Sequence, residues 1–155
     1  MSAARLPACA VGYGVPRAGV PAVVSFDKWV TAAMLQASST DKRQCSIRVV
    51  GTIEGRALNR TWRDRDYATN VLSFPSSAPT DAPQQWLGDI VLCAPVIARE
   101  ARTQRKRTRD HYAHLTVHGV LHLLGFDHER TPEARAMERL ERRILADLGI
   151  TDPYY

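Results

Sequence analysis

The sequence predicts one domain in which helices and short strands share a core. Three observations support this prediction. The chain has 155 residues, which is enough for one sizeable core. Its apolar residues recur at helical spacing in some segments and at alternate positions in others. All five histidines fall within residues 111–128, so one short region holds most of the side chains that typically bind metal ions.

Periodicity places helices and strands along the whole chain. The segment Gly88–Cys93 is almost continuously apolar, which is typical of a strand in the middle of a sheet. The first half is expected to hold a strand over residues 5–11, a helix that Ser25 caps and that runs to about Ser38, a strand over about 45–53, a helix near 54–63 and the strand Val71–Phe74. The second half is expected to hold a loop over 76–86, the strand Gly88–Cys93, helices over about 95–108 and 111–124, and a last helix that Thr131 caps and Gly149 ends.

Composition sets broader limits on function. The chain has 21 Lys and Arg residues against 16 Asp and Glu residues, and this net charge of +5 permits a polyanionic partner. The three cysteines are far apart and form no Cys-x-x-Cys pair, so we expect reduced thiols in a cytoplasmic protein. No apolar run is long enough for a membrane span, so we expect no membrane partner. Prolines and glycines interrupt residues 1–21, which are the least well defined part of the predicted domain over residues 1–155.

Two histidines of the predicted helix over residues 111–124 have the spacing of metal ligands. Apolar filler residues and the absence of proline predict that this segment is a helix. Gly125 is expected to end it, because glycine most easily adopts the left-handed conformation beyond a helix. His118 and His122 lie one turn apart on this helix and face the same way, so both can bind one metal ion.

The third ligand is expected from beyond the helix end. His114 shares the same face, but it lies eight residues from His122, roughly 12 Å along the axis at about 1.5 Å per residue. That distance is too long for both side chains to reach one ion. The turn at Gly125 instead brings back His128, and three protein ligands are typical of an open zinc site. A single histidine on an apolar face would simply be packed in the core, but three at this spacing favour a metal site.

One position separates this pattern from a zinc protease. The spacing His-x3-His-x2-Gly-x2-His is that of the metzincin proteases, in which a glutamate follows the first histidine and acts as general base. Here that position is Gly119, so ordinary peptidase chemistry lacks its proton acceptor. Glycine inside a helix costs about 1 kcal/mol relative to alanine. The bare backbone therefore suggests a close approach by a substrate or by a neighbouring strand.

The C-terminal part of the predicted helix over 95–108 is basic. Arg102, Arg105 or Lys106, and Arg109 are expected on one face, where they could track the phosphates of a nucleic acid. The alternative is an ordinary solvated face, since charge runs and helix C-termini commonly carry exposed cations.

Three blocks of the sequence follow one another in order. They are Leu-Asn-Arg-Thr-Trp-Arg continuing to Thr-Asn-Val-Leu-Ser-Phe-Pro, then Gly-Asp-Ile-Val, and finally His-Gly-Val-Leu-His-Leu-Leu-Gly-Phe-Asp-His. Together they resemble the YbeY family of bacterial metal-dependent endoribonucleases and rRNA maturation factors. The resemblance covers about residues 45–155, and Ala68 stands where the family often has proline.

The resemblance implies a fold and a function. The implied fold is α+β, a single domain with a small mixed β-sheet packed with helices, in which a zincin-like metal helix is followed by a glycine turn. The implied activity is single-strand-specific, metal-dependent endoribonuclease cleavage in rRNA processing, at the 3′ end of small-subunit rRNA, and in ribosome biogenesis and quality control. RNA and the small ribosomal subunit are the expected partners, together with ribosomal proteins or assembly factors. The implied site has one zinc ion per chain on His118, His122 and His128, with Arg63 as the essential basic residue.

Several further residues are candidates for contacts around this site. Asp127 either orients a ligand histidine or caps the Gly125 turn, and His114 either contacts the substrate or packs. Asn59, Asn70 and Asp89 are candidates for the same kinds of contact.

Two other functions stay open from the sequence. One is a metallopeptidase-like hydrolase with a displaced base. The other is a non-catalytic, zinc-containing ribosome assembly factor. Its closed zinc site would need a fourth ligand, for which Asp127 and Glu129 are the nearest residues in sequence.

Overall fold

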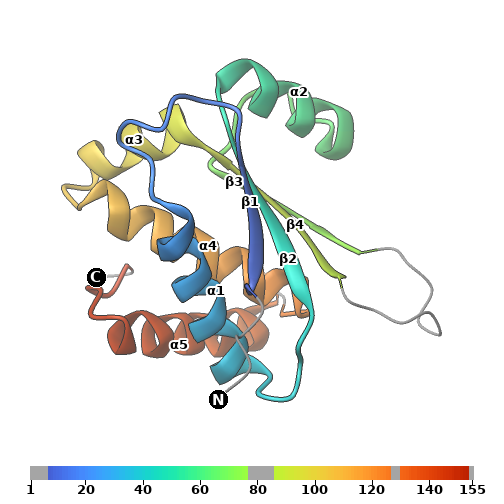
Figure 1. Ribbon diagram of the computed structural model, residues 1–155, viewed down its shortest axis with the longest axis vertical. Helices are drawn as coiled ribbons and strands as arrows, with labels where there is room; N and C mark the ends of the chain where they lie inside the picture. Colours follow the sequence, from blue (N-terminus) through green and yellow to red (C-terminus); the bar gives the residue numbers. More distant parts are fainter. Residues whose placement is uncertain (1–6, 77–85, 127–129, 154–155) are drawn as a thin grey trace, which may run out of the picture.

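A four-stranded mixed sheet lies at the centre of the fold, and helices pack against it (Figure 1). The computed structural model describes residues 7–76, 86–126 and 130–153. This arrangement confirms the predicted α+β class. In chain order the elements are β1 (Cys9–Tyr13), α1 (Val23–Ala37), β2 (Gln44–Val50), α2 (Thr52–Arg63), β3 (Val71–Pro75), β4 (Trp86–Cys93), α3 (Ala94–Thr103), α4 (Thr108–Leu123) and α5 (Thr131–Asp147).

The sheet has the strand order β1-β2-β4-β3. β1, β2 and β4 run parallel, whereas β3 pairs antiparallel with β4 and forms one edge. β4 is therefore an interior strand, as its continuous apolar run predicted. Cys9, Cys45 and Cys93 are all buried free thiols, as expected from their spacing.

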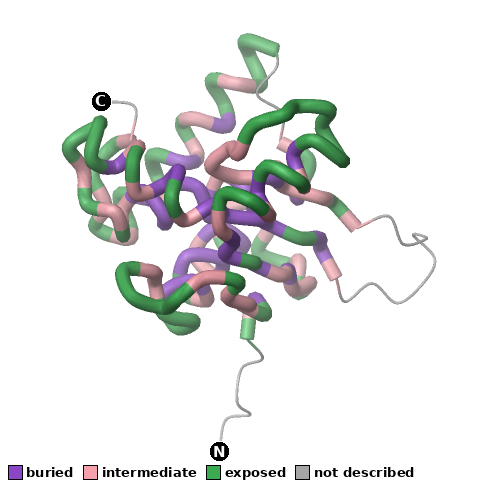
Figure 2. The backbone as a smooth tube through the Cα atoms, turned by 90° about the horizontal axis from the view of Figure 1, so that it is seen from above, coloured by how far each residue is buried: buried purple, intermediate pink, exposed green. Residues whose placement is uncertain are grey.

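The two faces of the sheet carry different layers of helices. α1, α4 and α5 lie on one side and α2 lies on the other (Figure 1). Because side chains alternate along a strand, Ile90 and Leu92 of β4 join the main core under α4, whereas Val91 and Cys93 join a smaller cluster with Leu58 of α2. The buried residues gather in the middle of the molecule between these layers (Figure 2). None of the described helices is long and apolar enough to span a lipid bilayer.

The helix α4 packs unusually close to the sheet at Gly119. A Cβ atom added to Gly119 would lie 3.1 Å from carbons of the Ile90 side chain, tighter than ordinary van der Waals contact. Of the two predicted explanations for this glycine, a substrate or a neighbouring strand, the structure shows the strand. Glycine here lets the backbone of the histidine-bearing helix rest on the centre of β4.

Several element boundaries differ from prediction. The first strand is Cys9–Tyr13 among the described residues, rather than 5–11. The strand expected over 45–53 ends at Val50, because Gly51 is the N-cap of α2. Ser25 is not a cap: α1 begins at Val23, and Ser25 is buried within it. Thr131 is likewise the first residue of α5, after Arg130 at the N-cap.

The predicted helix over 95–108 forms as α3 but is shorter than predicted, because the chain turns after Thr103. Arg105 has a left-handed φ of 54°, and the N–H of Lys106 donates to the carbonyl of Ala101 (3.0 Å), a bond that closes a helix end. Arg109 belongs to α4, where its guanidinium carbon lies 5.5 Å from the Trp29 ring centroid. Arg102, Arg105 and Arg109 therefore do not share one helix face.

The contact between α4 and β4 predicts a cost for any side chain at Gly119. Overpacking a core costs about 1–3 kcal/mol, and the higher helix propensity of alanine, about 1 kcal/mol, offsets only part of it. We expect Gly119→Ala to lower the free energy of urea unfolding, and Gly119→Glu to lower it more because it buries a charge. Gly12→Ala is the control, since the nearest atom to its new Cβ is 3.9 Å away. A Gly119→Ala protein as stable as the wild type would contradict the close packing.

Candidate metal centre

Four histidines form a row along one face of α4. His111, His114, His118 and His122 are spaced by three, four and four residues, so each lies about one turn after the previous one. Successive ring centroids are 6.2, 6.2 and 4.5 Å apart. The last pair is the closest, and it is the pair that the sequence predicted as metal ligands.

The facing nitrogens of this pair suit a shared cation. The Nε2 atoms of His118 and His122 lie 3.0 Å apart. Two ligands of a tetrahedral zinc ion, each about 2.0–2.1 Å from the metal, are roughly 3.3 Å apart. A few tenths of an ångström of side-chain movement would therefore let both imidazoles bind one ion. The predicted third ligand, His128, and the neighbouring Asp127 and Glu129 lie outside the described residues.

A buried carboxylate that the sequence analysis missed lies beside the histidines. Glu141 of α5 is completely buried, and its two oxygens lie 3.0 Å from His114 Nε2 and 2.7 Å from His118 Nδ1. Together these three residues offer ligand atoms within 4.8 Å of one another. A signal was present in the sequence, since Glu141 lies one turn from both Met137 and Leu145 on the apolar face of α5.

The Glu141 carboxyl is ionised in this environment. Burial on its own would raise its pKa, but hydrogen bonds from His114 and His118 outweigh burial and lower the pKa to about 2. An ionised carboxylate only accepts hydrogen bonds, so the imidazole nitrogens that face it are both donors. His118 therefore carries a proton on Nδ1.

Arg63 lies across a cleft from the histidine pair. Its Nη2 donates to the carbonyl of Ser73 in the edge strand β3 (3.0 Å). The cleft has a volume of about 360 Å³, and three elements meet there: the end of α2, the edge strand and α4. Its lining residues are Arg63, Asn70, Val71, Leu72, Ser73, Pro75, His118 and His122. The structure thus brings Arg63 together with two of the predicted ligands.

Asn59 and Asn70 make hydrogen bonds that shape the chain around the cleft. Asn59 is buried and donates to the carbonyl of Tyr67 (2.8 Å), in the turn between α2 and β3. The Asn70 side chain accepts from the N–H of Val71 (2.7 Å) and donates to Glu100 (3.0 Å). Asn59 thus holds the turn, whereas Asn70 both anchors β3 and lines the cleft.

Asp89 lies apart from the described histidines. In β4 it alternates with Ile90, so its side chain points to the sheet face opposite α4. There it accepts hydrogen bonds from the Ser46 hydroxyl and from the Trp86 indole N–H. The structure therefore does not bring Asp89 together with His118 or His122.

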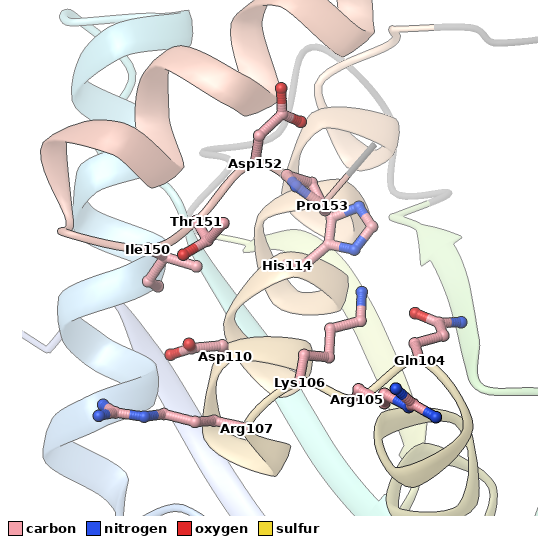
Figure 3. Close-up of a pocket in the computed structure, with 10 residues that line it drawn as sticks. All are labelled: Gln104, Arg105, Lys106, Arg107, Asp110, His114, Ile150, Thr151, Asp152 and Pro153. Atoms are coloured by element: carbon pink, nitrogen blue, oxygen red, sulfur yellow. The ribbon is translucent and has the colours of Figure 1, made fainter. Parts of the chain in front are cut away.

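His114 lines a second and larger cavity, of about 770 Å³ (Figure 3). Its lining comes from the link between α3 and α4, from α4 itself and from the segment after α5. Arg105, Lys106 and Arg107 give this cavity a basic wall, and His114 lies in it. Arg102 and Arg109 do not line it, so the three arginines expected on one face point to separate places.

The fold and the site together define a class of protein: a small α+β protein with a histidine-rich candidate metal centre next to an arginine. The model of one family, Endoribonuclease YbeY, matches residues 22–149. The chain belongs to this family.

Curated relatives named Endoribonuclease YbeY match over nearly the whole chain. A relative from Stenotrophomonas maltophilia (strain R551-3) is 58% identical over 149 residues, covering 94% of this chain and 91% of the relative. A relative from Xylella fastidiosa (strain 9a5c) is 60% identical over 148 residues, covering 93% and 91%. A protein from Thermotoga maritima with a solution structure is similar in fold, with a TM-score of 0.57 and 18% identity over 94% of this chain and 97% of that one.

The hydrogen bond between Asn59 and Tyr67 predicts a structural role for Asn59. Asn59→Ala removes this hydrogen bond, and the loss of a typical intramolecular hydrogen bond costs about 0.5–1.5 kcal/mol. We expect this loss in the free energy of unfolding measured with urea. Thr61→Ala, an exposed position in the same helix, should change that value by less than about 0.5 kcal/mol. Equal stabilities for the two variants would show that Asn59 does not hold the turn.

Proposed function

We propose that this protein is a metal-dependent endoribonuclease that cleaves single-stranded RNA in rRNA processing. The observation that carries the proposal is the cleft in which Arg63 faces His118 and His122. Family membership supports the same reaction, because the relatives are named as endoribonucleases. The net charge of +5 suits a polyanionic substrate.

The proposed cofactor is one zinc ion per chain. The spacing of the His118 and His122 nitrogens fits such an ion, and His128 would complete the set of three ligands. When bound, zinc supplies a Lewis acid that polarises a phosphoryl oxygen.

The chain itself supplies a phosphate clamp. A guanidinium presents five N–H donors in a planar fork that matches phosphate, and Arg63 uses one of them on the carbonyl of Ser73 at the cleft. Held there, Arg63 can bind the phosphate and neutralise the charge that grows in the transition state. The edge strand therefore orients this side chain before the substrate arrives.

The same helix argues against ordinary peptidase chemistry. A metzincin protease has its general base where this chain has Gly119, and here that position faces Ile90 of the sheet. In RNA the nucleophile can be a neighbouring 2′-hydroxyl, which forms a bond to phosphorus and loses its proton to solvent while the 5′-oxygen of the next nucleotide leaves. This cleavage needs no glutamate at position 119 to activate a water molecule. Position 119 thus favours RNA over peptide as the substrate.

Other contacts to RNA are proposed more broadly. Arg102, Arg105 and Arg109 are exposed cations that can each contact a backbone phosphate, although from different parts of the surface. The proposed target is the 3′ end of small-subunit rRNA, with ribosomal proteins or assembly factors as further partners.

The proposed metal pair predicts which histidines control metal content. We expect about one zinc ion per chain in purified protein, measured by elemental analysis. His118→Ala and His122→Ala should abolish tight binding and lower the melting temperature, since a bound ion stabilises the folded state. The control is His111→Gln, which alters a histidine of the same row that instead contacts Glu100 (2.8 Å). Full zinc content in His122→Ala would rule out the His118–His122 pair.

The phosphate clamp predicts a rate defect for Arg63 variants. Arg63→Ala should reduce the single-turnover rate of cleavage of a single-stranded RNA by about 10²–10³-fold, the usual cost of losing one donor to a transition state. Arg63→Lys should recover little of this rate, because a point charge cannot reproduce the two-pronged contact.

Arg60→Ala is the matched control, because it changes an exposed arginine three residues earlier in α2. It should cleave at nearly the wild-type rate. Zinc content and far-ultraviolet circular dichroism should be the same in all three variants. Cleavage by Arg63→Ala at the wild-type saturating rate would exclude the clamp, and hydrolysis of peptide but not RNA by the wild-type protein would exclude the proposed function.

A further inference from the structure

We propose that Glu141 is a positioning residue, which fixes the orientation and the protonated nitrogen of His118 so that the other nitrogen is available to a metal ion. The inference rests on the proposed metal centre but not on RNA cleavage. Glu141 lies on α5, 23 residues away from His118 in sequence. Its role comes from contacts that only the folded chain creates.

The contact between Glu141 and His118 gives the two imidazole nitrogens different roles: Nδ1 carries the proton and Nε2 is left for a metal ion. His118 Nδ1 lies 2.7 Å from Glu141 Oε1, and His118 Nε2 lies 3.0 Å from His122 Nε2. Because the carboxylate only accepts, the proton of a neutral His118 is on Nδ1, and Nε2 holds a lone pair directed at His122. A carboxylate behind a ligand histidine is a common way to set its tautomer and raise its basicity.

Burial makes this contact a fixed part of the structure. The Glu141 side chain is 0% exposed, and a buried carboxylate is stable only when hydrogen bonds compensate for the water it has lost. His118 provides one of these bonds from α4, and His114 provides another at 3.0 Å. Rotating His118 away from the cleft would leave part of the carboxylate without compensation, so the ring is held in its orientation.

Glu141 could alternatively bind the metal itself, together with His114 and His118. Two observations favour the positioning role. The 2.7 Å separation of Glu141 Oε1 from His118 Nδ1 is a normal hydrogen bond, well below the roughly 3.3 Å between two ligands of tetrahedral zinc. In addition, the cleft that Arg63 faces is lined by His118 and His122 and not by Glu141. An ion held by Glu141 and His118 Nδ1 would lie on the opposite side of the His118 ring from His122 Nε2.

His114 has a supporting role in this arrangement. Its Nε2 donates to the second oxygen of Glu141, while its ring also lines the basic cavity between α4 and the chain after α5 (Figure 3). His114 therefore holds the carboxylate in place from the side away from the cleft. It does not need to contact the metal ion.

The first test measures the tautomer of His118 in metal-free protein. At about pH 8.5, where an ordinary histidine is neutral, long-range ¹H–¹⁵N correlation spectra distinguish the two ring nitrogens. We expect Nδ1 of His118 to carry the proton in the wild type. Glu141→Gln should shift His118 toward the Nε2-protonated form, because the amide nitrogen of glutamine can donate to Nδ1. A wild-type His118 protonated on Nε2 would overturn the proposal, even if Glu141→Gln does not fold.

The second test measures zinc affinity by competition with a chromophoric chelator. We expect Glu141→Gln to weaken binding by about 10- to 100-fold, the usual effect of removing a group that orients a ligand. Glu138→Gln is the matched control, since it makes the same charge change one turn earlier in α5, and its affinity should equal that of the wild type. Wild-type affinity in Glu141→Gln would overturn the positioning role.

A pair of histidine variants separates positioning from direct binding. If Glu141 positions His118, His122→Ala should lose tight zinc binding, whereas His114→Gln, whose amide can still donate to Glu141, should stay within several-fold of the wild type. If Glu141 is itself a ligand, His114→Gln and Glu141→Gln should lose binding and His122→Ala should keep it. None of these measurements uses RNA, so a failure of the proposed endoribonuclease function would leave them interpretable.

Discussion

The buried carboxylate of Glu141 ties the last helix of the chain to the helix that carries the histidines. Removing a charge from water is costly, and two imidazole donors from α4 compensate for it. The compensation requires α4 and α5 to pack with these three side chains in register. The orientation of the His118 ring is therefore set by the same packing that builds the core.

At the edge strand β3, residues of α2 on one face of the sheet and of α4 on the other face line one cleft. α2 packs on one face and α4 on the other, so a side chain from α2 can reach the histidines only by passing around an edge. β3 is that edge, and its outward carbonyl at Ser73 holds Arg63 on the way. The turn before β3 makes this possible. Asp64 ends α2 in a left-handed conformation with φ of 57°, and Asn59 binds the carbonyl of Tyr67.

Gly119 shows how one position changes the use of a shared ligand pattern. In the proteases with this spacing, the position supplies a proton acceptor. In this protein the absence of a side chain allows the backbone of α4 to pack against Ile90, whose carbons would lie only 3.1 Å from a Cβ atom at this position. The position therefore serves the packing of the helix on the sheet, and the cleft depends on Arg63 for its charge.

The sequence alone determined the features that depend on residues close together in the chain. Helical spacing placed His118 and His122 on one face, and a continuous apolar run placed β4 inside the sheet. Periodicity did not predict the end of α3 at Thr103. There the N–H of Lys106 bonds to the carbonyl of Ala101, and the resulting turn separates Arg102 from Arg109.

Tertiary structure decided which distant groups meet at the site. Arg63 lines the same cleft as His118 because β3 is an edge strand, and Glu141 contacts His118 because α5 packs against α4. The position of Glu141 on an apolar helix face indicates burial, but it does not identify the partner. The reason is physical: periodicity reports which side of an element faces the core, whereas the partners across the core depend on how whole elements pack.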